Sequence, residues 1–575
     1  MAKVLKGIGA SDGIALGKAL LLKEEQLVIP NDKTKDIEEE IQKFEQGVQS
    51  SLKDLKNLVE ITTAKLGAEK AAIFGAHEEI VQDPAIAQDV EELIKNEQKN
   101  AAQAVKEVFD KYHETFLQMD DPYFKERASD VNDVANRLIK HLLGVKIVDL
   151  STIDEEVIIV SDDLTPSQTA QLDKKFVKGF ATNIGGRTSH AAIMARSLEL
   201  PAVLGLKSIT QTVTDGAMTS VNGTTGEVMV ELDANDVVAI KKTQVEFEKN
   251  QTLLKSYVDQ PSITRDQHKV LIEANIGKPA DCEAVLKNGG EGIGLFRSEF
   301  LYMENDHFPT EEEQFQAYKE VVDQMHGNLV VIRTLDIGGD KKLSYYQFPA
   351  ELNPFLGYRA IRFCLDHPDI FRTQLRALLR ASAFGPLGIM FPMIATIDEF
   401  NQAKALVEEC KAELSAAKVE FDQKVQVGMM VEIPAAAVNA KNFAKVADFF
   451  SIGTNDLVQY SMAADRMNQS VAYLYQTLNP SLLNLIKMTI DGAHAENKWV
   501  GMCGEMAGDQ LAVPLLLGMG LDAFSMNATS ILRARSIINN LDYQSAQTLA
   551  NQALMLSTSK EVESLVQAFL KKNNF

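Results

Sequence analysis

One stretch of the sequence combines a flexible turn with a histidine at the start of a predicted helix. Glycines at 185–186 permit a backbone turn that residues with side chains resist. Thr188 and Ser189 are favoured helix N-cap types, and residues 191–196 favour helix. His190 is therefore predicted in the first helical turn, where free N–H groups and the helix dipole favour an anion. A neutral imidazole there can act as a nucleophile, and the same donors would hold a phosphoryl group on it.

The same features also suit a histidine that only caps a helix or lies on the surface. The phosphoryl hypothesis therefore requires a donor site elsewhere in the chain. The 314 residues from 262 to 575 are the place to look for it, because their length suits a (β/α)₈ barrel of roughly 250 residues plus insertions.

Eight short apolar runs, separated by helical stretches, are predicted to be the buried parallel strands of this barrel. Active sites of such barrels lie at the C-terminal ends of the strands, so the polar residues that follow the runs are the most informative. The runs are KVLIEAN (269–275), EGIGLF (291–296), NLVVIRT (328–334), LGIMFPM (387–393), VGMMVEI (427–433), DFFSIG (448–453), WVGMC (499–503) and LDAFSM (521–526).

Five of these runs end at, or are followed directly by, residues that could do chemistry. Arginines present rigid charged forks to phosphate and carboxylate oxygens. Glu432 and Asp456 are hard oxygen ligands suited to Mg²⁺, Asn455 can hydrogen-bond a phosphate, and Cys503 can donate a proton to a carbon centre. With Arg466, which lies further along the chain, the candidate set is Arg297, Arg333, Glu432, Asn455, Asp456, Arg466 and Cys503.

Composition and cysteine use narrow the class of protein. The net charge of −22 argues against a nucleic-acid binder and favours partners with basic surfaces. Cys282, Cys364, Cys410 and Cys503 show neither metal-ligand spacing nor a disulfide framework, so we expect a reducing, cytoplasmic location. The first residues lack the pattern of a signal peptide, and no apolar run reaches the roughly 18 residues of a membrane-spanning helix. Membrane insertion is therefore not expected.

The N-terminal half is predicted to be an α/β domain (1–30 and 144–234) interrupted by a helical insert (31–143). A strand-rich segment of about 22 residues could not bury a core alone, so it must combine with the later strands. Residues 235–261 are predicted to be a linking helix, and residues 262–575 the barrel domain. The predicted strands are KVLKGIG (3–9), IALGKALLL (14–22), KIVDL (146–150), EVIIVS (156–161), KFVKGFAT (175–182) and GEVMVEL (226–232).

The insert is acidic, with 24 Asp and Glu against 15 Lys and Arg, and the ratio is seven to one between Gly67 and Leu93. Such a run can be only a solvated face. Alternatively, it is a docking surface for a basic protein partner that charge steers onto it. In that case we expect apolar residues such as Ile73, Phe74 or Ile80 to contribute to the contact.

Over essentially its whole length the sequence resembles Enzyme I of the phosphoenolpyruvate-dependent sugar phosphotransferase system. The resemblance implies a swivelling α/β phosphohistidine domain with an inserted helical bundle, followed by a (β/α)₈ barrel that dimerises. The matching segments are GGRTSHAAIMAR (185–196), GIGLFRSEFLYM (292–303), RTLDIGGDK (333–341), VEIPAA (431–436), SIGTNDLVQY (451–460) and GMCGEMAGD (501–509).

The resemblance also implies roles for individual residues. His190 would take the phosphoryl group from phosphoenolpyruvate, with Mg²⁺ as cofactor, and pass it to the carrier protein HPr docked on the insert. Glu432 and Asp456 match the metal ligands, and Cys503 matches the proton donor. The residues that match substrate contacts are Arg297, Arg333, Asn455, Asp456 and Arg466, with Arg359 in GYRAIR as a further site residue.

Two other functions remain open from the sequence. A pyruvate phosphate dikinase or phosphoenolpyruvate synthase has similar phosphohistidine and barrel domains. Those enzymes also need a nucleotide-grasping domain, whereas this chain has the acidic helical insert and no G-x-x-x-x-G-K-[ST] loop. A non-catalytic phosphoenolpyruvate sensor is the third option, and it gives His190 and Cys503 no purpose.

Overall fold

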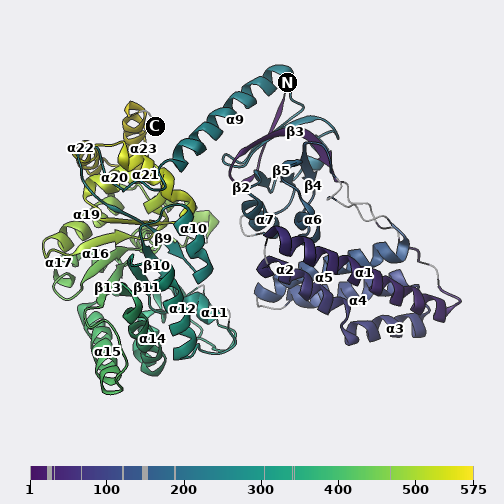
Figure 1. The fold of residues 1–575 in the computed structure, drawn as a ribbon, viewed down its shortest axis with the longest axis horizontal. Coiled ribbons are helices and arrows are strands. Elements are labelled where there is room, and N and C mark those ends of the chain that lie inside the picture. The colour runs from purple at the N-terminus through teal and green to yellow at the C-terminus, as the bar shows by residue number, and fades with distance from the viewer. Residues whose placement is uncertain are drawn as a thin grey trace. The chain divides into compact units, whose positions relative to one another are not determined.

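The computed structural model describes residues 2–573 and 575, except 23–26, 28, 32, 67, 119–121, 146–149, 151–152, 187–188, 304, 340, 342 and 467. The chain forms two compact units, Met1–Asn250 and Gln251–Phe575 (Figure 1). Within the described residues, no helix is both long and apolar enough to cross a lipid bilayer.

The first unit contains a mixed eight-stranded sheet with the order β1-β8-β7-β3-β4-β5-β6-β2. Its centre, from β3 to β6, is parallel, and the outer strands pair antiparallel. Buried apolar clusters flank the sheet. The strands are β1 (Lys3–Lys6), β2 (Ile8–Ser11), β3 (Ile14–Leu21), β4 (Val157–Ser161), β5 (Val177–Thr182), β6 (Ala202–Leu204), β7 (Met218–Asn222) and β8 (Glu227–Val230).

The chain leaves this sheet after β3 and returns with β4, and a helical bundle forms in between. Lys18 of β3 lies opposite Val157 of β4, so the two halves of the sheet join directly across the insert. The bundle has its own apolar core, to which α1 contributes one face with residues spaced three and four apart. Its helices are α1 (Ile37–Leu66), α2 (Ala68–Val81), α3 (Pro84–Glu97), α4 (Ala101–Gln118) and α5 (Pro122–Leu143).

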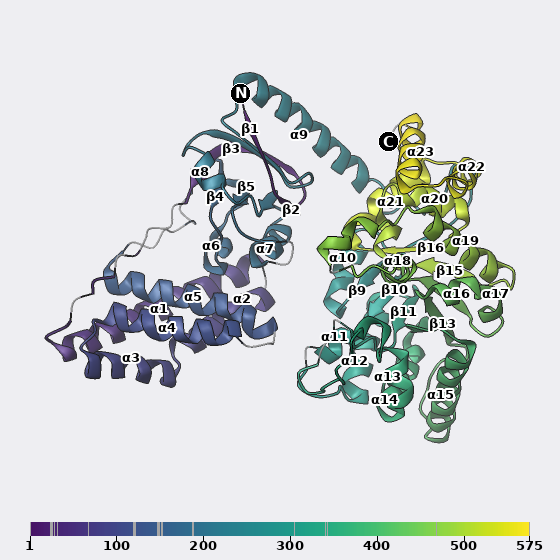
Figure 2. The same cartoon turned by 180° about the vertical axis from the view of Figure 1, so that it is seen from behind.

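Four further helices complete the N-terminal half of the chain. Helices α6 (Pro166–Gln171) and α7 (His190–Leu198) follow β4 and β5, and α8 (Ile209–Thr212) follows β6. Helix α9 (Ala234–Lys255) buries none of its residues, as expected for a helix that connects two folded parts (Figure 2).

The second unit is a closed barrel of eight parallel strands in the cyclic order β10-β11-β12-β13-β14-β15-β16-β9. Its strands are apolar on both faces, because one face meets the surrounding helices and the other fills the barrel interior. The strands are β9 (Leu271–Ile276), β10 (Ile293–Arg297), β11 (Val330–Arg333), β12 (Leu387–Phe391), β13 (Gln426–Val431), β14 (Phe449–Ile452), β15 (Trp499–Met502) and β16 (Ala523–Met526).

Helices surround this barrel. Three of the longer ones begin with a capping box, in which Thr310, Thr396 or Thr558 exchanges hydrogen bonds with a glutamate three residues later. The helices are α10 (Cys282–Lys287), α11 (Glu299–Met303), α12 (Glu311–Gln324), α13 (Ile361–Asp366), α14 (Pro368–Ala381), α15 (Ile397–Ala416), α16 (Pro434–Val438), α17 (Ala440–Phe443), α18 (Thr454–Met462), α19 (Pro480–His494), α20 (Ala512–Met519), α21 (Ile531–Asn539), α22 (Tyr543–Leu554) and α23 (Ser559–Lys572).

The predicted fold class is confirmed, and all eight predicted barrel strands are present. The N-terminal half differs from the prediction in detail. The first predicted strand is divided into β1 and β2, and β6 and β7 were not predicted. β6 has only three residues, too few to show a pattern. The predicted strand 146–150 lies outside the described residues except for Leu150.

Candidate functional site

A cavity of about 680 Å³ opens at the C-terminal ends of the barrel strands. Each strand delivers its polar residues there because the strands are parallel and end at the same rim. All eight candidate residues of the barrel line this cavity. They are Arg297, Arg333, Arg359, Glu432, Asn455, Asp456, Arg466 and Cys503.

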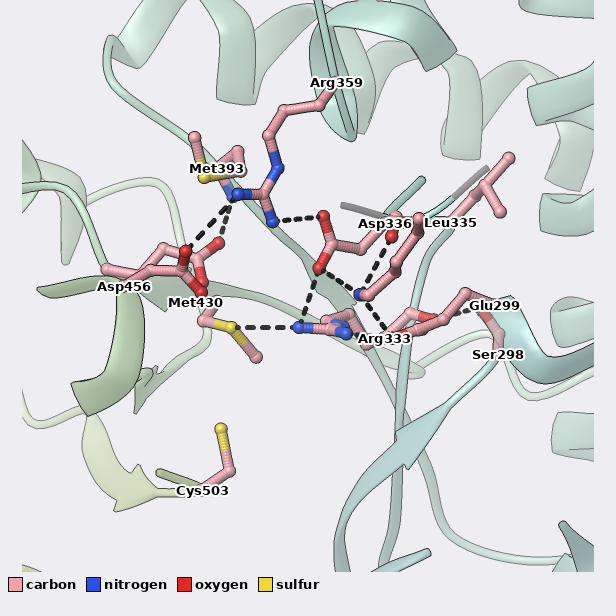
Figure 3. A network of polar contacts seen from close by, with 12 residues as sticks. Ser298, Glu299, Arg333, Leu335, Asp336, Arg359, Met393, Met430, Asp456 and Cys503 are labelled. Atoms are coloured by element: carbon pink, nitrogen blue, oxygen red, sulfur yellow. Dashed lines mark hydrogen bonds and ion pairs between the residues drawn. The ribbon is translucent and has the colours of Figure 1, made fainter. Parts of the chain in front are cut away.

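Arg333, the last residue of β11, is the centre of a buried charge cluster (Figure 3). Its guanidinium pairs with Glu299 and, at 3.1 Å, with Asp336. Lys341 binds the same two carboxylates, at 2.8 Å and 2.9 Å. Two cations therefore hold two buried anions in place, as buried charges require.

Arg359 connects this cluster to the start of helix α18. Its guanidinium contacts Asp336 at 2.9 Å and Asp456 at 3.3 Å. Arg466 lies 3.8 Å from the other oxygen of Asp456. Asp336 is thus shared by two arginines and a lysine, and it fixes their spacing.

The cluster fixes the charge states of its members. Burial by itself would raise the pKa of Glu299, but Arg333 and Lys341 hold it below its usual value. Burial likewise opposes ionisation of Asp336, yet Lys341 and Arg333 keep its pKa well below the usual range. For Arg333, burial is outweighed by Glu299 and Asp336, which raise its pKa. All of these groups are therefore charged at neutral pH.

Two arginine N–H donors of the cluster have no hydrogen-bond acceptor among the described residues. In the part of the chain that the structure describes, the Nε atoms of Arg333 and Arg359 are buried without a hydrogen-bond acceptor. Arg297, at the end of β10, makes no ion pair with any described residue. A buried N–H group without an acceptor is costly, so these groups suit an anionic ligand that would accept from them.

Glu432 follows β13 and faces the same cavity. One of its oxygens accepts a hydrogen bond from the backbone N–H of Met393 at 2.5 Å. The other oxygen is buried and has no partner among the described residues. Burial, reinforced by the negative charges of Asp456 and Asp336, raises the pKa of Glu432 to about 8. A cation at this position would remove the cost of ionising it.

The residues present fit a hard divalent cation. Among the described residues, no group of three or more His, Cys, Asp and Glu side chains is arranged to enclose a metal. Mg²⁺ does not need such a cage, because it typically takes one or two carboxylates and completes its shell with substrate oxygens and water. Glu432 and Asp456 are a donor set of that kind.

Cys503 follows β15 and is 4% exposed. Burial raises the pKa of its thiol to about 11, although Ser451 and Arg333 oppose the shift. The thiol therefore keeps its proton at neutral pH. Figure 3 shows it pointing toward the charged cluster. Cys282, Cys364 and Cys410 are also buried, but they lie in helices away from the cavity, as expected of cysteines that only pack.

Asn455 lies in the first turn of α18, beside Asp456. The hydroxyl of Tyr475 donates a hydrogen bond of 3.1 Å to its side-chain oxygen. This contact engages the amide oxygen of Asn455, which also lines the cavity. Tyr475 thus determines the orientation of an amide that could otherwise turn either way.

The structure places His190 where the sequence predicts it, as the first residue of α7. Ser189 is the N-cap residue, and its hydroxyl accepts from the N–H of Ala192 at 3.4 Å. Gly185 has a φ of +112°, a conformation that residues with side chains rarely adopt. The position of the His190 side chain, like residues 187 and 188, lies outside the described residues.

Five charged or polar residues of the cavity were not singled out from the sequence: Glu299, Asp336, Lys341, Tyr475 and Glu505. All but Tyr475 lie within motifs that were recognised, but only the fold shows that Glu299 and Asp336 each contact both Arg333 and Lys341. Tyr475 lies in a loop without a motif. The sequence alone could not have identified Tyr475 as a site residue, because only the fold brings it next to Asn455.

In the helical insert, the prediction that Phe74 contributes to a partner contact is wrong. Phe74 is 1% exposed and packs edge-on against His77 at 5.8 Å, so it belongs to the bundle core and cannot contact a partner. Ile73 and Ile80 are partly buried and pack against the same core. Glu79 is exposed and Glu78 is half-buried, so the acidic character predicted for this helix does reach the surface.

Models of known protein families match most of the chain. The family model described as PEP-utilising enzyme, PEP-binding domain matches residues 251–543. The model described as PEP-utilising enzyme, N-terminal, matches residues 6–127, and the one described as PEP-utilising enzyme, mobile domain, matches residues 153–226. PEP is phosphoenolpyruvate.

Full-length relatives are closely similar. A phosphoenolpyruvate-protein phosphotransferase of Mycoplasma capricolum is 61% identical over 570 residues, which cover 99% of each chain. Proteins of the same name from Staphylococcus carnosus and Listeria innocua are each 53% identical, over 571 and 569 residues. Both matches cover 99% of this chain and 100% of the relative.

Proposed function

The chain belongs to the phosphoenolpyruvate-utilising enzymes, and we propose that its barrel cavity binds phosphoenolpyruvate and that His190 receives the phosphoryl group. The protein is an enzyme that transfers a phosphoryl group from phosphoenolpyruvate to a protein, as its full-length relatives are named for doing. The dikinase and synthase alternative is not supported by these relatives. The observation that carries the site assignment is the convergence of all eight candidate residues on one cavity.

The arginines would bind the substrate. Phosphoenolpyruvate carries a phosphate and a carboxylate, and both are matched by the fork of a guanidinium. Arg333 and Arg359 each have a buried Nε without an acceptor, and Arg297 makes no ion pair within the described residues. Arg466 and the amide of Asn455 provide further donors at the same rim. Because Glu299 and Asp336 hold the arginines, the donors are in place before the substrate arrives.

The reaction then divides between two residues. The bond between phosphorus and the enol oxygen breaks, and a ring nitrogen of His190 forms the new bond to phosphorus. The electron pair left on oxygen forms an enolate, whose C3 takes the proton of the Cys503 thiol to give pyruvate. The Cys503 thiolate recovers a proton from solvent before the next turnover.

Enzymes of this family generally depend on a metal ion. We assign it as Mg²⁺, held by Glu432 and Asp456, because both are hard oxygen donors and Glu432 has a buried oxygen without a partner in the described chain. When bound, the cation would neutralise negative charge on the phosphoryl group and the enolate.

Domain roles follow from the same assignment. Residues 1–30 with 144–234 would carry His190, residues 31–143 would dock the carrier protein, and residues 262–575 would bind phosphoenolpyruvate. One histidine must then visit two sites, so we propose that the His190 domain swings as a rigid body, with residues 235–261, whose helical part is α9 and ends at Lys255, as linker. The mobile-domain model that matches residues 153–226 supports this proposal.

Two partners are proposed. We propose HPr as the carrier, which would be steered to the acidic insert by charge. A second copy of this chain is the other partner, joined through the barrel. Leu352, Leu356 and Tyr473 are exposed apolar side chains of the barrel unit that would be covered in such a dimer.

One labelling experiment tests the function. The protein is incubated with Mg²⁺ and phosphoenolpyruvate labelled at phosphorus, with and without ATP, and then with HPr. Stable labelling without ATP, followed by loss of label to HPr, is the expected result. Labelling that requires ATP would point to a dikinase, and binding without labelling would point to a sensor.

A further inference from the structure

A hydrogen-bonded pair of side chains lies inside the barrel beneath Cys503. Asn275, near the end of β9, donates its amide N–H₂ to the backbone carbonyl of Cys503 at 2.9 Å. Ser525 of β16 donates its hydroxyl to the amide oxygen of Asn275 at 2.7 Å. Strand β16 lies between β9 and β15, so Asn275 reaches across one strand, and Ser525 supports it from that strand.

The pair can form in only one orientation. A backbone carbonyl only accepts hydrogen bonds, so the nitrogen of the Asn275 amide must face Cys503 and its oxygen must face Ser525. The Ser525 hydroxyl therefore acts as donor and prevents the amide from turning over. Ser525 is 2% exposed, so water has little access to compete for this bond.

The other side of Cys503 is held by the preceding strand. The N–H of Cys503 donates to the carbonyl of Ile452 at 3.1 Å, and the N–H of Gly504 approaches the same oxygen at 3.4 Å. A Cβ atom added to Gly504 would lie 1.7 Å from the hydroxyl of Thr454, so the chain passes close over the start of α18. Cys503 thus has a backbone contact on each side, and its thiol also donates to the carbonyl oxygen of Ile452 at 3.8 Å.

We propose that Asn275 and Ser525 are positioning residues that hold the Cys503 thiol on the face of the enolate where it delivers its proton. Neither residue is among the described side chains that line the cavity, so neither touches the substrate. The proposal rests on the proposed function, in which Cys503 is the proton donor. Loss of either hydrogen bond would release the Cys503 carbonyl and let the thiol move away from C3.

The face of protonation is a readout that a merely structural role would not change. We would use phosphoenol-2-oxobutyrate of Z geometry, which carries a methyl group on C3, and run the turnover in D₂O. A deuteron delivered by a fixed thiol gives one stereoisomer of the 3-deuterated product, whereas a deuteron taken from solvent gives both. The full-length protein, Mg²⁺ and HPr are used throughout.

Asn275→Asp is the sharpest variant, because it keeps the oxygen that accepts from Ser525 and removes the N–H that holds Cys503. Ser525→Ala leaves Asn275 in place but removes its support. Asn288→Asp is the matched control, since Asn288, which caps the C-terminus of helix α10 away from the cavity, makes the same kind of bond to the carbonyl of Ala284, at 2.8 Å. Cys503→Ala defines the result without the donor.

The wild type and Asn288→Asp should give one stereoisomer, and Cys503→Ala should give both. Asn275→Asp should give a mixture, with pyruvate formation from phosphoenolpyruvate slowed on the order of 10-fold and KM changed less than about twofold. Ser525→Ala should show the same effects more weakly. One stereoisomer at wild-type rate from Asn275→Asp, when Cys503→Ala gives both, would overturn the positioning role. One stereoisomer from Cys503→Ala would instead remove Cys503 as donor, and the proposal with it.

Discussion

In the barrel cavity, charged side chains at or near the ends of several strands are fixed by ion pairs with one another. At the first turn of α7, by contrast, backbone N–H groups provide the environment that favours an anion. Arg333 and Arg359 are fixed through Glu299 and Asp336, and all four are buried. His190 follows a glycine turn and an N-cap serine on a helix of nine residues. A site that must bind an anion and guide bond breaking needs many fixed groups, but a carrier needs one reactive group that can be presented to two partners.

This comparison predicts that damage at the two regions has different consequences. His190→Ala should abolish stable phosphorylation and all transfer to HPr, because the chain then lacks its acceptor. Binding of phosphoenolpyruvate to the barrel should persist with a dissociation constant within about twofold of wild type, since the cavity is intact. Labelling and calorimetric titration measure the two effects. Full labelling of this variant would show that another residue carries the phosphoryl group.

Arg333→Met should damage both binding and folding. Its removal leaves Glu299 and Asp336 buried with one cation fewer, a change that typically costs about 3–5 kcal/mol. We also expect kcat/KM for phosphoenolpyruvate to fall by at least ~100-fold, as for loss of a charged group aimed at the reacting phosphate. Denaturant unfolding and steady-state kinetics check these values.

Arg372→Met is the matched control for this change, because Arg372 pairs with Glu409 at 2.5 Å on the exposed face of α14 and α15. It should cost less than about 1 kcal/mol and leave kinetics unchanged. Equal effects of the two substitutions would mean that the buried cluster contributes no more to stability and activity than an exposed ion pair does.

The sequence predicted the barrel better than the N-terminal sheet, and the reason is physical. Parallel barrel strands are buried on both faces, so each is visible as a continuous apolar run ending in a polar residue. Strands β6 and β7 are short and lie in a mixed sheet, so neither a run nor a long alternation marks them. The residues that could bind phosphate were found because arginine, glutamate and cysteine at strand ends are unusual.

The groups that hold those residues were not found from the sequence. Asp336 contacts Arg359, and Asn275 contacts Cys503, across long distances in the chain. An aspartate or asparagine in a loop or strand has many ordinary roles, so its type alone says little. Only the closed barrel brings each pair together, and pattern alone does not give side-chain pairing.

The stability of the metal-free protein should depend on pH through Glu432. In the metal-free protein its pKa is raised to about 8, while the unfolded chain would lose this proton near its ordinary value of 4.5. Between these values the folded state binds more protons than the unfolded state, so this group's contribution to stability falls as pH rises through the folded pKa. Glu432→Gln should flatten that part of the stability profile, measured as Tm against pH.

The stabilisation by Mg²⁺ should have the opposite pH dependence and increase as pH rises. Cation binding requires the carboxylate, so saturating Mg²⁺ should raise Tm by more at about pH 8.5 than at about pH 6.5. The same Mg²⁺ effect at both pH values, or an effect retained in Glu432→Gln, would remove Glu432 from the metal site.

The smallest effect is expected from charge reversals in the helical insert. Reversing Glu78 and Glu79 to lysine should raise KM for HPr a few-fold, more at low salt than at high salt, and leave KM for phosphoenolpyruvate unchanged. Glu312→Lys and Glu408→Lys together make the same charge change on the barrel unit and serve as control. If both KM values rise, or neither does, the acidic residues of the insert form only a solvated face and do not dock HPr.

The decisive measurement is the position of the phosphoryl group on the chain. The protein is exposed to phosphoenolpyruvate and Mg²⁺ without ATP, digested under alkaline conditions that preserve phosphohistidine, and its peptides are sequenced by mass spectrometry. The account predicts one phosphoryl group, on His190 in the peptide that contains residues 188–196, and its loss when HPr is added. A phosphoryl group on any other residue, or an unmodified His190 peptide from protein that has released pyruvate, would contradict it.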